Sequence, residues 1–404
     1  MFFILENNKL IILGNGFDLA CGLKSKYADF FEKRISEDVS ACLDRIYQKF
    51  SVEIDEPIYY FETLYDVRDK YLKTKKEVDP FAIKIISLTK KDKEILKRSK
   101  LTFWDVVLFY FQKNDGEKLE EVDWKDIENR MLDFLENEES GKPSLVNILY
   151  MLEHFDSFAL DKINWLCLYL AKILSDEKKI SEDFVEYLYQ ELLLFESAFI
   201  DFLNDELFSN DDYEANAIDL LLDIVSVKDM SVLWEQKYLS FNYTIPTRSP
   251  YFNITNVHGT LSSGHIIFGI DQTEIEPSKY IFRFTKTFRQ MTETPISKRS
   301  EELILPSKDE IKEIAFFGHS LSPLDYSYFQ TLFDFYDLYS SNVTLAFYYK
   351  LYKDVTNLDM ELDLSKKISE MLKSYSPSIG NENKANNLMH KLLLEKRLII
   401  EEIS

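Results

Sequence analysis

Apolar and polar residues follow two different patterns along the chain. In residues 31–230, apolar positions recur every three or four residues, and glycine and proline are almost absent. This spacing is typical of amphipathic helices, and residues 184–199 show it most clearly. From about Trp234 onward, short apolar runs end at glycine or a turn residue, which is typical of strands.

Six short apolar runs predict strands, at residues 9–14, 238–243, 254–258, 265–269, 313–318 and 343–349. The continuous apolar character of the last two runs suits central strands of a parallel sheet, with helices over both faces. Helices are predicted over 25–35, with Ser25 as N-cap, over 326–339, and over 364–400, interrupted near Pro377 and Gly380.

These elements predict an α/β fold with a parallel sheet made from two pieces of sequence. The strand near the N-terminus joins the strands that follow residue 236. We assign residues 1–30 and 231–404 to this discontinuous core, and residues 31–230 to a mostly helical insertion. Connections in compact domains are usually short, so an insertion of this length should pack as a layer of its own.

Charge separates the same two parts. The net charge of the 404-residue chain is −22, with 46% hydrophobic and 15% aromatic residues, which suits a folded chain with a substantial core. Residues 31–230 hold 26 Lys and Arg against 45 Asp and Glu, whereas the remainder holds 22 against 25. The acidic insertion argues against nucleic acid as a partner, although the near-neutral core can bind an anion locally.

Several classes of protein are disfavoured by what the sequence contains. The three cysteines, Cys21, Cys42 and Cys167, share no metal-ligand spacing, and such a sparse count fits a reducing cytosol. No apolar run is long enough to cross a bilayer, and residues 1–5 lack the features of a signal peptide. There is no Gly-x-Ser-x-Gly elbow. We expect a cytoplasmic protein with no metal and no membrane partner.

Glycine and histidine concentrate where the predicted strands end. Seven of the ten glycines and three of the five histidines lie in three neighbourhoods, around Gly14, His258 and Gly318. Ligands of doubly wound sheets bind beyond the carboxyl ends of the strands. Gly14, Asn242, His258 and Gly318 are therefore expected along one edge. The loop at 14–18 is either a ligand cradle, because glycine permits close backbone approach, or a plain turn.

Asn242 and His258 each allow two interpretations. Asn242 can form a turn, or its amide can orient a water or a ribose hydroxyl. His258 can be a structural histidine at a strand end, or a general base near neutral pH.

The loop at 318–325 also carries polar chemistry. Ser320 or Ser322 could cap the following helix, with Asp325 in its first turn. These capping roles leave the neighbouring His319 unexplained.

A basic stretch containing Arg283, Lys286 and Arg289 lies in the near-neutral part. It is either a solvated face or the best candidate for neutralising phosphate. The insertion segment 124–128 carries acids at 126 and 128, which do not share a helix face, so capping or core roles are favoured there.

Four segments, in order, resemble the AbiH family of bacterial abortive-infection proteins. They are Gly-Asn-Gly-Phe-Asp-Leu-Ala at 14–20, Ser-Phe-Asn-Tyr-Thr at 240–244, Val-His-Gly at 257–259, and Phe-Gly-His-Ser-Leu at 317–321 followed by Asp325. Segments 124–128 and 283–287 fit the family as well. The resemblance spans nearly the whole chain and implies a role in defence against phage inside the bacterial cell.

The order of these motifs is also similar to that of sirtuin-like domains, which bind NAD on a Rossmann-like core. This resemblance implies that Asn242 positions a ribose or a water and that His258 acts as base. We add Asp18 as a group that stabilises cationic ribose character. The expected nucleotide-binding residues are Gly14, Asn15, Gly16, Phe17, Gly318, His319, Ser320, Asp325, Arg283 and Lys286. The chain lacks the four-cysteine zinc module of sirtuin deacetylases, so deacetylation is disfavoured.

Two functional hypotheses follow. The first is an enzyme that cleaves the glycosidic bond of NAD or a related nucleotide and so arrests an infected cell. The second is a non-catalytic module that senses a nucleotide or a phage protein, with the acidic insertion as the partner surface. A nuclease is a weaker third hypothesis, because the negative charge opposes it. A phage-derived trigger protein and a second copy of the chain are the expected protein partners.

Overall fold

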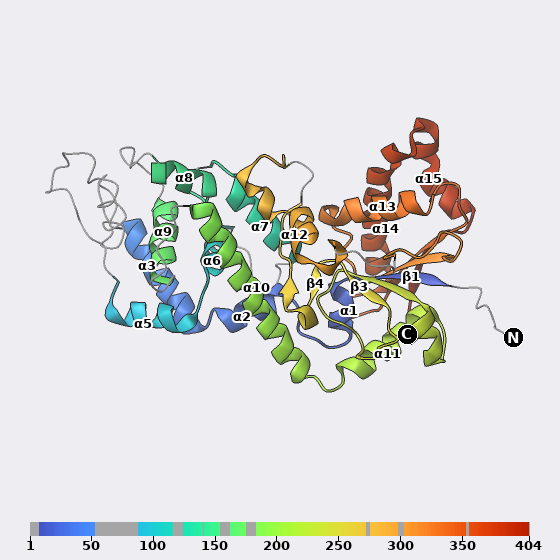
Figure 1. Cartoon of the computed structure of the whole chain (residues 1–404), viewed down its shortest axis with the longest axis horizontal. Helices are drawn as coiled ribbons and strands as arrows, with labels where there is room; N and C mark the ends of the chain where they lie inside the picture. The colour runs from blue at the N-terminus through green and yellow to red at the C-terminus, as the bar shows by residue number, and fades with distance from the viewer. Residues whose placement is uncertain are drawn as a thin grey trace.

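A computed structural model describes residues 8–52, 88–115, 124–139, 141–153, 162–174, 183–271, 275–297, 303–352 and 355–403. Figure 1 shows that the molecule is elongated, with a group of helices at one end and a sheet with its own helices at the other. Residues 1–5, in which we find no signal-peptide features, lie outside the described ranges. In the described part, no helix is both long and apolar enough to cross a membrane.

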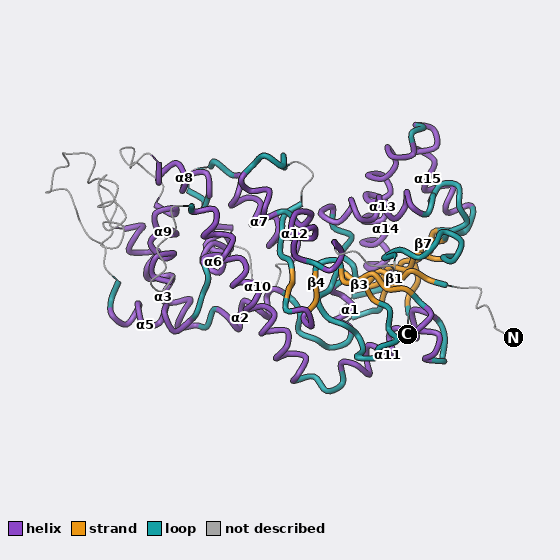
Figure 2. The backbone as a smooth tube through the Cα atoms, viewed as in Figure 1, coloured by secondary structure: helices purple, strands orange, loops and turns teal. Residues whose placement is uncertain are grey.

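The described residues form one six-stranded parallel sheet, in the order β3-β2-β1-β6-β7-β8. Its strands are β1 (Lys9–Leu13), β2 (Lys237–Ser240), β3 (Ile254–Asn256), β6 (Glu313–Phe317), β7 (Thr344–Tyr349) and β8 (Leu398–Glu402). Leu10 of β1 lies opposite Lys237 on one side and Ile314 on the other. The predicted α/β class is confirmed, and Figure 2 shows the strands gathered in one region.

Helices cover both faces of the sheet, which explains the continuous apolar character of its strands. Leu10 and Ile12 pack in one hydrophobic cluster with α13 (Tyr326–Phe335), α14 (Asn357–Tyr375) and α15 (Glu382–Leu394). Ile11 and Leu13 face the other way and pack with α1 (Asn15–Ala20) and α11 (Tyr213–Val225). The alternation follows from the period of two along a strand.

The insertion forms a helical layer with its own hydrophobic core. Its helices are α2 (Tyr27–Arg34), α3 (Glu37–Val52), α5 (Lys90–Ser99), α6 (Phe103–Asp115), α7 (Trp124–Glu136), α8 (Leu145–Glu153), α9 (Lys162–Leu174) and α10 (Phe184–Phe208). Phe268 and Phe284 from the later part of the chain join this core. Hydrophobic packing thus divides the chain differently from composition. Helix α11 packs on the sheet, whereas Ile266, Phe268, Ile270, Ile275, Ile281 and Phe284 pack on the insertion.

The C-terminal helix prediction was wrong at its end. The helix predicted up to residue 400 stops at Leu394, and Lys396, with φ of 57°, turns the chain into the edge strand β8.

The predicted strand 265–269 is also wrong in length and place. It is reduced to β5 (His265–Ile266), which pairs antiparallel with β4 (Gly259–Thr260) outside the main sheet. Ser25 does not cap α2 either, because Lys26 is the N-cap and the Ser25 hydroxyl donates to Asn15 Oδ1 at 2.7 Å.

Candidate functional site

Four strands of the main sheet end along one edge, and polar or glycine residues follow each of them. Gly14 follows β1 and Gly318 follows β6, while Asn242 and His258 come two residues after the ends of β2 and β3. These strands are parallel neighbours, so the structure brings the four residues to the same edge.

The two glycine loops close on each other. The N–H of Gly14 donates to the Phe317 carbonyl oxygen at 3.0 Å, and that of Gly16 donates to Gly318 at 2.7 Å. A Cβ on Gly14 would lie 2.4 Å from the Cα atom of His319. Glycine is therefore needed here for contact between two backbones, and two N–H groups of the expected phosphate cradle are already engaged.

Side chains of the first loop are engaged in the protein as well. Asn15 accepts the hydrogen bond from Ser25, which holds the loop that precedes α2. Phe17 is buried, with its ring edge-on to that of Phe317 at a centroid separation of 6.2 Å. Asn15 and Phe17 thus have structural contacts that account for their conformations.

Asp18 lies in a buried hydrogen-bond network. The Thr244 hydroxyl lies 2.9 and 2.8 Å from its two carboxylate oxygens, and the Tyr213 hydroxyl donates to Oδ1 at 2.7 Å. Burial raises the pKa of Asp18 to about 6, although hydrogen bonds from Tyr213, Thr244 and Asn242 act to lower it. Both oxygens of Asp18 thus accept hydrogen bonds from the protein, and the Asn242 side chain is one of the donors.

Asn242 presents an amide oxygen without a partner. The side-chain Nδ2 of Asn242 donates to the Gly14 carbonyl oxygen at 3.0 Å, and the backbone carbonyl oxygen of Asn242 accepts from Asn256 Nδ2 at 2.7 Å. Oδ1 is buried and makes no hydrogen bond within the described residues. A buried acceptor left unpaired costs about 1–3 kcal/mol, so the position requires an explanation.

His258 presents a ring nitrogen in the same condition. Its ring makes a hydrogen bond to the backbone of Phe241, whereas the buried Nε2 has no partner in the part of the chain that the structure describes. Nδ1 therefore carries the proton and Nε2 the lone pair. Burial, followed by the charge of Lys286, lowers the pKa of His258 to about 3. The ring is consequently neutral at pH 7, and it is a weaker base than the general base near neutral pH that we expected.

His319 has the opposite tautomer. Its Nδ1 accepts from the Leu321 N–H at 2.9 Å, so the proton lies on Nε2, which is 3.6 Å from Asp325 Oδ2. Burial lowers the pKa of His319 to about 4. The neighbouring Ser320 is exposed, and it is Ser322 that caps the following turn.

Lys286 lies between two carboxylates. Its Nζ is 2.8 Å from Glu128 Oε1 and 3.2 Å from Asp325 Oδ1, and all three side chains are largely buried. Burial opposes the charge of Lys286, but Asp325 and Glu128 outweigh it and raise its pKa. Burial raises the pKa of Glu128 to about 7. Burial also acts to raise the pKa of Asp325, but Lys286, His319 and His258 together outweigh it and lower that pKa. Two carboxylates thus share one ammonium.

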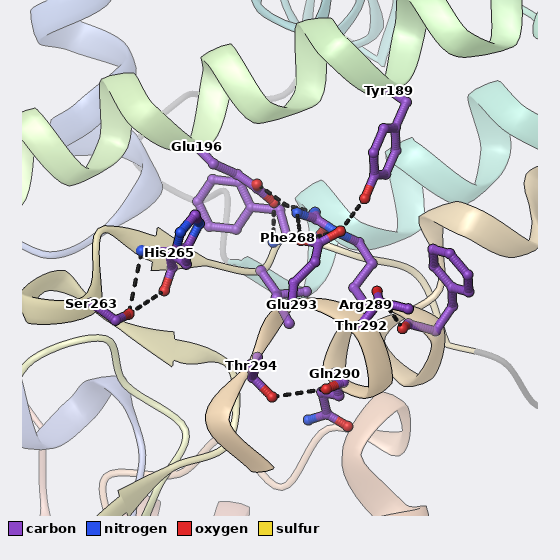
Figure 3. Close-up of polar contacts among 12 residues, drawn as sticks. Tyr189, Glu196, Ser263, His265, Phe268, Arg289, Gln290, Thr292, Glu293 and Thr294 are labelled. Carbon is purple, nitrogen blue, oxygen red and sulfur yellow. Dashed lines mark hydrogen bonds and ion pairs between the residues drawn. The ribbon is translucent and has the colours of Figure 1, made fainter. Parts of the chain in front are cut away.

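The two arginines of the basic stretch pair with carboxylates too. Arg283 pairs with Glu186 of α10. Figure 3 shows Glu196 and Glu293 converging on Arg289, whose Nη2 lies 2.8 Å from Glu196 Oε2. Arg283 and Lys286, which we expected to neutralise phosphate, are therefore already paired with carboxylates of the protein. Within the described ranges, no group of His, Cys, Asp and Glu could hold a metal ion.

Most of the sequence matches one protein family. The model of the family described as "Bacteriophage abortive infection AbiH" matches residues 10–349. The chain belongs to the AbiH family. The AbiH match begins in β1 and ends with β7, so it contains the whole site described above. Membership of AbiH implies a role in phage abortive infection. No curated protein and no solved structure matches the chain.

Sequence reasoning missed four residues of this AbiH site, namely Glu128, Tyr213, Thr244 and Asn256. Asn256 could have been found, because it lies within the predicted strand 254–258, two residues before His258. It locks the loop by donating to the carbonyl oxygens of Asn242 and Thr244. The acid at 128 was noted but given a capping or core role, because its partner Lys286 lies 158 residues away in sequence. Tyr213 gave no signal, because Asp18 lies 195 residues away.

Proposed function

We propose that this AbiH protein is a defence enzyme that hydrolyses the N-glycosidic bond of NAD or a related nucleotide at the carboxyl edge of its sheet. The observation that carries the proposal is the pair of buried atoms without partners, Asn242 Oδ1 and His258 Nε2. They follow adjacent parallel strands, and a substrate hydroxyl or an attacking water would satisfy both.

The order of the strands supports a nucleotide as ligand. Counted in chain order within the sheet, the strands run 3-2-1-4-5-6. That is the order of doubly wound sheets that bind dinucleotides at the point where the order reverses. Here the order reverses between β1 and β6, and the Gly14 and Gly318 loops leave the sheet at this point.

The charge of the site supports a cationic reacting centre. Three largely buried carboxyl groups, those of Asp18, Glu128 and Asp325, lie at or near this edge beside a single ammonium, that of Lys286. Glycosidic cleavage passes through an oxocarbenium-like ribose, which a negative environment stabilises. The same negative charge disfavours phosphate here. We therefore place the ribose of the nucleotide at the site and name no phosphate-binding residue.

The proposed reaction uses both atoms without partners. A water bound to Asn242 Oδ1 forms its bond to C1′ of the ribose and passes a proton to His258 Nε2. The C1′–N bond breaks, and nicotinamide leaves with the electron pair as a neutral base. The products are ADP-ribose, nicotinamide and one proton, which His258, neutral at the start, accepts from the water and passes on to solvent.

The closure of the two glycine loops on each other favours a second candidate, a module that senses a nucleotide or a phage protein without turnover. Measuring cellular NAD during phage infection separates the two. We expect NAD to fall in cells that carry the wild-type chain, and Asn242→Ala or His258→Ala to abolish both this fall and the defence. His265→Ala, at an exposed histidine, is the matched control. Defence that survives the double variant would support the sensing module.

A further inference from the structure

We propose that Glu128, which the helical insertion supplies from α7, is a further positioning residue of the site at the carboxyl edge of the sheet. Its role in a reaction rests on the proposed function, whereas its link to His319 through Lys286 and Asp325 does not. The insertion would then be a wall of the site as well as a separate layer.

A continuous chain of polar contacts leads from Glu128 to His319. Both oxygens of Glu128 contact Lys286 Nζ, at 2.8 and 3.0 Å. Lys286 in turn lies 3.2 Å from Asp325 Oδ1, and the other oxygen of Asp325 faces His319 Nε2 at 3.6 Å. Every side chain in this sequence is largely buried, so water screens the contacts little.

The position of Glu128 determines how Lys286 shares its charge. With Glu128 ionised, the ammonium binds two carboxylates, and Asp325 Oδ2 remains available to accept from His319. With the charge of Glu128 removed, Lys286 would pair with Asp325 alone and weaken it as an acceptor. The ammonium would also act more strongly on both histidines of the site, whose pKa values it already lowers.

A second contact links the helix that carries Lys286 to the residue before His258. Lys286 begins α12 (Lys286–Glu293), and Gln290 on this helix donates to the carbonyl oxygen of Val257 at 2.8 Å. Val257 directly precedes His258, so α12 contacts the polypeptide on both sides of the site. Docking of α7 on α12 through Glu128 therefore fixes the helix that holds both histidines in place.

Glu196 of α10 provides a matched comparison, because its partner Arg289 lies on the same helix, α12, as Lys286. It is a buried carboxylate of the insertion and pairs with Arg289 of α12, as Glu128 pairs with Lys286. The other hydrogen-bond partners of Arg289 are Glu293 and the Phe268 carbonyl oxygen (Figure 3). They reach His258 only through its backbone, because the N–H of Ile267 donates to the His258 carbonyl oxygen at 2.9 Å. A purely structural role predicts similar effects for Glu128→Gln and Glu196→Gln.

The test is nitrogen NMR of the full chain labelled only in histidine, at pH 8.5, where Glu128, whose pKa burial raises to about 7, is ionised. Five histidines give five sets of ring signals, and His258→Gln and His319→Gln assign the two of interest. We expect Glu128→Gln to displace the signals of both His258 and His319, and Glu196→Gln to leave them in place. Unchanged signals in Glu128→Gln, or equal displacement in both variants, would overturn the proposal. If Glu128→Gln does not fold, Glu128→Asp withdraws the carboxylate by one methylene and serves the same comparison.

Activity separates this inference from the proposed function. If the chain hydrolyses NAD, we expect Glu128→Gln to lower kcat about tenfold with little change in KM, as supporting residues often do. Displaced histidine signals without NAD hydrolysis by the wild type would leave Glu128 as a positioning residue and refute the proposed reaction. NAD hydrolysis by the wild type, with histidine signals that Glu128→Gln does not displace, would support the proposed reaction and refute the positioning role of Glu128.

Discussion

The backbone N–H of Gly16 donates to the carbonyl oxygen of Gly318 at 2.7 Å, which joins the loop after β1 to the loop after β6. A Cβ on Gly16 would lie 2.7 Å from the Cα atom of Gly318, well inside the normal contact distance. The two loops can only meet because both residues are glycine. This contact closes the sheet edge between its two central strands and places Asn242 and His319 against the first loop.

We expect Gly318→Ala to destabilise the fold more than Gly264→Ala. Both glycines have a positive φ, of 68° and 70°, so each alanine carries a backbone cost of about 1–2 kcal/mol. A Cβ at Gly318 would also lie 2.2 Å from the N atom of Phe17, whereas one at Gly264 meets no atom within 4 Å. Urea unfolding should show a loss larger by at least about 2 kcal/mol for Gly318→Ala. Equal losses would mean that the loops do not meet as described.

The stability of the chain should depend on Asp18 between pH 4 and pH 6. Burial first of all raises the pKa of Asp18 from 3.8 to about 6 in the folded state, so folding retains a proton that the unfolded chain has released. The free energy of unfolding of the wild type should therefore fall by about 3 kcal/mol relative to that of Asp18→Asn as the pH rises through this window. Urea unfolding of both proteins at several pH values measures the difference. A constant difference would show that Asp18 ionises normally.

His258 should contribute acid sensitivity with the opposite sign. Burial and Lys286 lower its pKa from 6.5 to about 3, so the unfolded chain binds a proton that the folded chain does not. Stability from this group is complete above pH 6.5 and is lost as the pH falls toward 3. We expect His258→Gln to flatten the acid limb of the stability curve. His265→Gln, at an exposed position, should leave the limb as in the wild type.

The ion pair between Glu196 and Arg289 should be far more important for stability than that between Glu186 and Arg283. Arg289 is fully buried, and Glu196→Gln leaves it Glu293 as its remaining carboxylate partner, so the loss should lie at the lower end of the cost of breaking a buried pair, about 3 kcal/mol. Arg283 and Glu186 are both about a third exposed or more, so Glu186→Gln should cost less than about 1 kcal/mol. Thermal unfolding of Glu196→Gln and Glu186→Gln compares the two. Similar melting temperatures would contradict the burial of Arg289.

The sequence was sufficient to predict the sheet edge, because parallel strands bring their carboxyl ends together whatever connects them. Gly14, Asn242, His258 and Gly318 each follow a strand, and their convergence needed only that rule. It could not reveal that the glycine loops contact each other, since a loop that approaches a ligand and one that approaches another backbone need glycine equally.

Long-range ion pairs explain the rest of what sequence reasoning missed. Lys286 and Glu128 are 158 residues apart, and Arg289 and Glu196 are 93 apart, so no local pattern joins them. The strand at Leu398–Glu402 was hidden because it directly follows a helix without glycine or proline between them, and the turn is made by Lys396.

The most direct test of the proposed reaction is release of nicotinamide from NAD by the purified full chain, alone and with lysate from phage-infected cells. The account predicts nicotinamide and ADP-ribose in equal amounts, loss of both with Asn242→Ala and with His258→Ala, and full activity of His265→Ala. Absence of nicotinamide under both conditions, with a phage against which the chain protects living cells, would contradict it.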